Sequence, residues 1–154
     1  MKPIALTLPI LLAAALLAAC APKATGPQPP EIVYDQDMCD ECGMIISDAR
    51  FAAATVLVEG APHKFDDIGE MLVYHMDHPE AQVKAWFVHD YKSQAWIRGE
   101  TAYFVKSDSL ITPMGGSIAA FEDRAAAEAF AADKGGHVFT FDELRVAVHL
   151  AAHG

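Results

Sequence analysis

Basic residues are scarce in this chain of 154 residues. Eleven lysines and arginines stand against 21 aspartates and glutamates, which gives a formal net charge of −10. No part of the sequence gathers its basic side chains into a cluster. Because proteins that bind nucleic acid neutralise phosphates with concentrated positive charge, we expect no nucleic-acid partner. The length predicts one compact domain.

The sequence also lacks the motifs of common enzyme classes. No glycine-rich phosphate loop follows an expected strand, and the serines, histidines and aspartates show no persuasive catalytic order. Paired acidic residues occur, but nothing places them around a substrate cleft. These absences agree with the prediction, which a family resemblance described below implies, that the protein is not an enzyme.

No apolar run is long enough to span a bilayer as a helix. The longest, residues 4–17, is interrupted only by Thr7 and Pro9, and a spanning helix needs about 20 residues. After the basic start at Lys2, this run fits a secretory signal. Small residues then precede Cys20, as in a bacterial lipobox. We predict that residues 1–19 are a signal peptide and that Cys20 is lipidated, which anchors the protein to a membrane facing the periplasm, with the outer membrane slightly favoured. An uncleaved signal anchor is the alternative.

The segment after Cys20 is rich in proline and shows no apolar period. Pro22, Pro27, Pro29 and Pro30 all fall within residues 20–35, a composition typical of a semi-rigid extended linker. We expect residues 20–35 to be the lipid anchor and tether, and residues 36–154 to be the folded domain.

Hydrophobic periodicity in the domain predicts short strands that alternate with helices. Strands are expected at 51–58, 63–65, 83–88, 95–97, 103–105, 117–121 and 137–141, and helices from 68 to before Pro79, from about 126 to 133, and after a cap at Asp142. Phe65-Asp66-Asp67 and Phe121-Glu122-Asp123 occupy matching points of two similar halves. We predict an α+β fold of two ββαβ-like halves, with antiparallel strands and helices on one side.

Only three cysteines are present, and two of them lie in one short segment. Residues 38–44 read Met-Cys-Asp-Glu-Cys-Gly-Met, in an expected loop. Thiols and a thioether are soft donors that select Cu(I), and Gly43 would let Met44 fold back toward Cys42. A structural zinc site needs more ligands of this kind, and a redox pair of the thioredoxin type would begin a helix. In an oxidising compartment, a Cys39–Cys42 disulfide explains the spacing as well as a metal site does.

Other residues are weaker candidates for ligands. Met114 lies between Pro113 and two glycines, which places its thioether on a turn, although methionine more often fills a core. His75 and His78, and likewise His149 and His153, share helix faces, yet exposed histidines without a metal are commoner. Asp66-Asp67 reads first as a helix cap and second as a source of ligands.

Taken together, these motifs resemble the NosL family, the copper-chaperone lipoproteins of nitrous oxide reductase assembly. The resemblance runs from about residue 39 to about residue 140. It is carried by Cys39-x-x-Cys42-Gly43-Met44, Arg50-Phe51-Ala52-Ala53, Phe65-Asp66-Asp67-Ile68-Gly69-Glu70-Met71-Leu72, Asp90-Tyr91 with Trp96-Ile97, Ala102-Tyr103-Phe104-Val105 and Thr112-Pro113-Met114-Gly115.

The resemblance implies a function and a site. It implies a fold similar to that of organomercurial lyases, with Cu(I) held by Cys42 and Met114 and, next in order, by Met44 and Cys39. It implies delivery of copper to nitrous oxide reductase through an ABC-transporter complex. A histidine or aspartate would complete the ligand set. The alternatives are a thiol-dependent enzyme related to organomercurial lyases and a metal-free assembly adaptor with a structural disulfide.

Overall fold

The computed structural model describes residues 26–153. The predicted signal peptide, Cys20 and the first part of the tether lie outside these residues. No helix between residues 26 and 153 is both long enough and apolar enough to cross a membrane.

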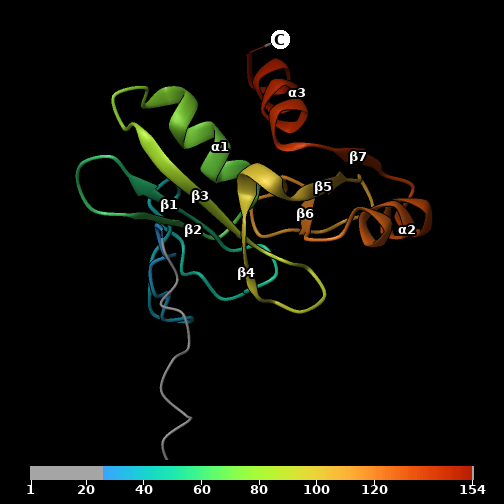
Figure 1. Cartoon of the computed structure of the whole chain (residues 1–154), viewed down its shortest axis with the longest axis horizontal. Helices are drawn as coiled ribbons and strands as arrows, with labels where there is room; N and C mark the ends of the chain where they lie inside the picture. Colours follow the sequence, from blue (N-terminus) through green and yellow to red (C-terminus); the bar gives the residue numbers. More distant parts are fainter. Residues whose placement is uncertain (1–25, 154) are drawn as a thin grey trace, which may run out of the picture.

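The first half of the domain is a four-stranded antiparallel sheet with one helix. Its elements are β1 (Ala53–Leu57), β2 (His63–Phe65), α1 (Ile68–Asp77), β3 (Val83–His89) and β4 (Trp96–Arg98). The strand order is β2-β1-β3-β4, and α1 covers one face of the sheet (Figure 1). A short 3-10 turn, η1 (Gly99–Thr101), leads into the second half.

The second half repeats this order of elements. It contains β5 (Tyr103–Lys106), β6 (Ile118–Phe121), α2 (Arg124–Lys134) and β7 (His137–Phe139), and it is followed by α3 (Phe141–His153). The strand order is β6-β5-β7, so the first strand of each half lies between the second and the third. The predicted α+β fold of two ββαβ-like halves is confirmed.

Acidic side chains begin both of the equivalent helices, as the sequence predicts. Asp67 caps α1 by accepting a hydrogen bond from Gly69 N at 2.7 Å, and Asp123 caps α2 by accepting from Ala126 N at 2.8 Å. Each carboxylate satisfies a backbone donor that the first helical turn leaves without a partner.

The prediction that Asp142 caps the last helix is wrong. Asp142 lies within the first turn of α3, and the predicted strand 137–141 ends at Phe139. The carbonyl of Thr140 accepts the first helical hydrogen bond, from Leu144 N at 2.9 Å. The backbone and hydroxyl of Thr140 both donate to Glu143 Oε2 at 2.8 Å. Thr140 and Glu143 thus form the capping pair of this helix.

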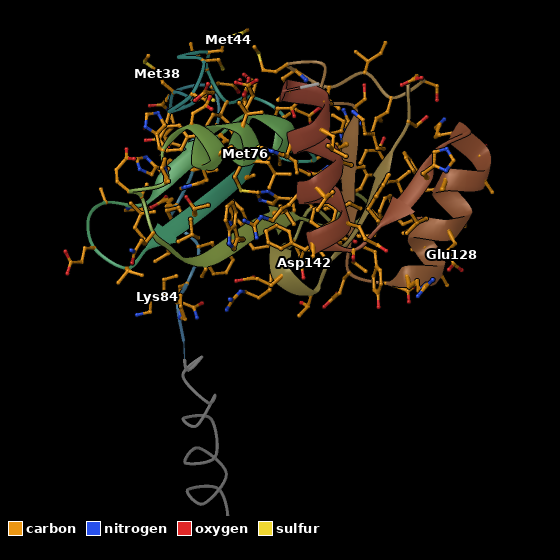
Figure 2. All side chains as sticks on the ribbon, turned by 90° about the horizontal axis from the view of Figure 1, so that it is seen from above. Met38, Met44, Met76, Lys84, Glu128 and Asp142 are labelled. Carbon is orange, nitrogen blue, oxygen red and sulfur yellow. The ribbon has the colours of Figure 1, made fainter. Side chains whose placement is uncertain are left out.

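One hydrophobic core joins the two halves. Phe65 and Met71 of the first half are buried in the same cluster as Phe104 and Leu144 of the second, and α1 contacts β6. The junction between β2 and α1 therefore lies where the two halves meet. Figure 2 shows Met38 and Met44 at one end of the molecule, and the blue start of the described chain leaves from the opposite end, where Lys84 lies.

Candidate metal centre

The two cysteines of the domain lie in a compact loop, as predicted. An isolated antiparallel bridge pairs Met38 with Ile45, and Cys39 N donates to the carbonyl of Met44 at 2.8 Å. Gly43 has a φ of +71°, a conformation that glycine adopts without the steric cost that other residues incur. This glycine closes the loop, and no helix follows it.

Folding brings Cys39 and Cys42 to the carboxylate of Asp66, the residue that follows β2. The two sulfurs and a carboxylate oxygen of Asp66 all lie within 4.8 Å of one another. Cys42 Sγ donates a hydrogen bond to Asp66 Oδ1 at 3.6 Å. Both cysteines are free thiols in the structure. Within residues 26–153, this is the one group of three or more histidine, cysteine or acidic side chains close enough to share a metal ion.

The two thiols differ in their surroundings. Cys39 is only 3% exposed and belongs to the hydrophobic core, whereas Cys42 is partly exposed. Burial raises the pKa of the Cys39 thiol to about 12, although hydrogen bonds with the backbone of Cys42 and Asp66 act in the opposite direction. Because the thiolate is the form that binds metal, Cys42 is the more accessible ligand of the pair.

The turn that carries Met114 is hydrogen-bonded to the junction between β2 and α1, the junction that also holds Asp66. Met114 N donates to Asp67 Oδ2 at 3.2 Å, and the hydroxyl of Thr112 donates to the same oxygen at 2.5 Å. Asp67 is the neighbour of Asp66 in the chain. Two loops that are far apart in the sequence therefore meet at the β2–α1 junction, one against Asp66 and the other against Asp67.

The methionines near this junction are exposed. Met114 is 38% exposed, Met44 51% and Met38 62%, and Met38 and Met44 lie at the same end of the molecule (Figure 2). Methionine usually fills cores, so three exposed thioethers on the two loops that contact this junction are unusual. The sequence predicts Met44 and Met114 as ligands, but not Met38.

The histidines have other partners. His75 Nε2 lies 2.9 Å from the hydroxyl of Thr55, and His78 Nδ1 lies 3.1 Å from Glu80. His63 Nδ1 is 3.4 Å from the carboxylate of Asp40, which belongs to the cysteine loop. The structure thus brings an aspartate, rather than a histidine, to the two thiols.

The electrostatic field at the junction is negative. The pKa of Glu70, in the first turn of α1, is raised by partial burial and then by the nearby carboxylates of Glu41, Asp67 and Asp66. The nearby carboxylates thus make it harder for Glu70 to lose its proton, as expected in a negative field. A field of this sign attracts a metal cation to the sulfur atoms.

Comparisons with known proteins place this arrangement in a family. The NosL family model matches residues 30–149. The chain belongs to the NosL family. The copper-binding lipoprotein NosL of Stutzerimonas stutzeri is 32% identical over 149 residues, which cover 90% of this chain and 78% of that protein. The crystal structure of the copper chaperone NosL from Shewanella denitrificans matches with a TM-score of 0.66 and 26% identity, over 77% of this chain and 96% of that one.

Two residues of the candidate site, Asp66 and Thr112, have an ambiguous signal in the sequence or none. Asp66-Asp67 reads as a cap, and the cap is Asp67 alone, which leaves Asp66 beside the thiols. Thr112 is an ordinary polar residue before a proline, and only the tertiary contact with Asp67 gives it a role. A carboxylate next to a cap, at the end of a strand, is the signal that could have indicated Asp66.

Proposed function

We propose that this protein carries Cu(I), with Cys42 and Met114 as its principal ligands. Met44, Cys39 and Asp66 complete the ligand set. The observation that carries the proposal is the meeting of the cysteine loop and the Met114 turn on the adjacent residues Asp66 and Asp67. Thiolate and thioether donors favour cuprous copper over harder ions.

The site is suited to giving up its metal. Cys42 binds as a thiolate, so uptake of copper releases a proton and weakens as the pH falls. Thioethers are neutral, and those of Met44 and Met114 are partly open to solvent. A ligand from another protein can therefore reach the copper before the ligands of the carrier leave it. A carrier role, rather than catalysis, is supported by this exposed arrangement and by the relatives, which are a copper-binding lipoprotein and a copper chaperone.

The proposed setting is the periplasmic side of a membrane. Residues 1–19 are removed as a signal peptide, the lipid on Cys20 provides the anchor, and residues 20–35 lead to the copper-binding domain, 36–154, with Ile32 already packed in the core of that domain. The partners are nitrous oxide reductase and its copper-related ABC-transporter complex. This setting is supported by the lipobox and by the name of the Stutzerimonas relative.

An anaerobic Cu(I) titration of the mature protein in detergent, against a competing chelator, tests the proposed ligands. We expect Cys42→Ser and Met114→Leu each to weaken Cu(I) binding by about tenfold or more, which corresponds to about 1.4 kcal/mol or more. Leucine keeps the size of methionine and removes the sulfur. Met76→Leu is the matched control, because Met76 lies on α1 away from Met44 (Figure 2). An affinity unchanged by both test substitutions would refute the proposed site.

A further inference from the structure

The Met114 turn is held by a hydrogen-bond network that ends on one buried carboxylate. Thr112 is 7% exposed and Asp67 is fully buried. The hydroxyl of Thr112 donates to Asp67 Oδ2 at 2.5 Å and accepts from Ser117 N at 3.1 Å. Thr112 thus connects both ends of the turn to the start of α1.

The Asp67 carboxylate is fixed in position. Burying a carboxylate is costly unless donors surround it. Among the described residues no cation pairs with Asp67. Its donors are Gly69 N, Met114 N and the hydroxyl of Thr112, together with the positive end of α1. A shift of this carboxylate would break several hydrogen bonds at once.

The turn also packs closely against this carboxylate. A Cβ atom added at Gly116 would collide with Asp67 Oδ1. The backbone of the turn is therefore confined from Thr112 to Gly116. The Met114 side chain has three rotatable bonds and is 38% exposed, so its sulfur can occupy several positions for one position of the backbone. The anchored backbone is what limits where that sulfur can reach.

We propose that Thr112 and Asp67 are positioning residues that hold the Met114 thioether at the cuprous site without touching the metal. This inference rests on the proposed function, because it requires Met114 to be a ligand. Groups that orient a metal ligand from behind commonly contribute 10- to 100-fold to metal affinity.

A double-mutant cycle tests the role of Thr112. Thr112→Val keeps the shape of the side chain and removes the hydroxyl, and Thr112→Ser keeps the hydroxyl. Each is made in the mature protein with Met114 and with Met114→Leu. With Met114 present, we expect Thr112→Val to weaken Cu(I) binding by about tenfold and to remove one sulfur from the copper X-ray absorption spectrum, while Thr112→Ser stays within about twofold. With Met114→Leu, Thr112→Val should have no further effect.

Two outcomes of this cycle would overturn the inference. Equal weakening by Thr112→Val in both backgrounds would show a general structural role, and an unchanged affinity would show no role.

If Thr112→Val does not fold, Asp67→Asn replaces it in the cycle, because asparagine also caps helices. It should weaken Cu(I) binding only when Met114 is present. If Met114→Leu alone leaves the affinity unchanged, the proposed ligand role of Met114 fails first. If Met114→Leu weakens binding and Thr112→Val does not, only the positioning role fails.

Discussion

Two cysteines separated by two residues have different environments in this protein. Cys39 packs in the core with a raised pKa, and Cys42 lies beside a carboxylate at the surface. Sequence spacing indicates a soft-metal pair or a disulfide but cannot rank the two sulfurs. Their burial depends on Ile46, Phe65 and the rest of the core that receives Cys39, and such packing is a property of the fold.

The difference between the thiols predicts selective alkylation. At pH 8, iodoacetamide should modify Cys42 at least about tenfold faster than Cys39, because the thiolate reacts and the Cys39 thiol is both buried and protonated. Mass spectrometry of peptides taken over time measures both rates. In guanidinium chloride the two rates should converge. Two thiols that become reactive only after reduction would instead indicate a resting disulfide.

The bounds of most elements follow from local patterns, and the exception has a physical cause. The sequence pattern predicts Asp142 as the cap of the last helix, whereas Thr140 and Glu143 form that cap in the structure. Pattern alone assigns Phe141 to the preceding strand. In the fold Phe141 is buried against Trp86, with ring centroids 5.2 Å apart, and this packing turns the chain into α3 one residue before Asp142. Thr140-x-x-Glu143 is itself a local capping pattern, and the sequence prediction misses it because Phe141 is assigned to the preceding strand.

Substitutions at the two possible caps should differ in their cost. Thr140→Ala should lower the free energy of unfolding by about 1 kcal/mol, because it removes the capping side chain of α3. Asp142→Ala removes only an exposed charge from the first turn and should cost less, about 0.3 to 0.5 kcal/mol. Urea denaturation monitored by circular dichroism measures both. Equal costs would mean that Asp142 contributes as much as the cap.

At the scale of the whole molecule, the architecture was predictable and the meeting of the two loops was less so. The duplicated ββαβ order follows from periodicity and from the two acid-capped helices. The hydrogen bond from Thr112 to Asp67 Oδ2 depends on the packing of α1, in the first half, against β6, in the second half. No local pattern contains that contact. In the sequence, the resemblance to the NosL family is the sole indication that Cys42 and Met114 bind the same metal ion.

The same packing across elements predicts how stability depends on pH. His75 of α1 contacts Thr55 of β1 and Trp86 of β3. Burial, and next the charge of His63, lower the pKa of His75 from 6.5 to about 4. Above pH 6.5 the ring is neutral in both the folded and the unfolded state. Between pH 6.5 and 4 only the unfolded state takes up a proton, so the folded state loses stability as the pH falls through this window.

The loss should amount to about 1 to 2 kcal/mol, a value reduced for the solvent that still reaches part of the ring. Urea unfolding at pH 7, 5.5 and 4.5 measures it. His75→Gln keeps a partner for Thr55 and does not titrate, so its stability should fall less over the same range. Parallel curves for the two proteins would show that His75 is not responsible.

The chain enters the described domain at the end opposite Met38 and Met44 (Figure 2). If Cys20 carries the proposed lipid, the anchored segment would join the domain on the side away from these two thioethers. A protein that takes up the proposed copper could then dock over Met38 and Met44 while the carrier stays attached to its membrane.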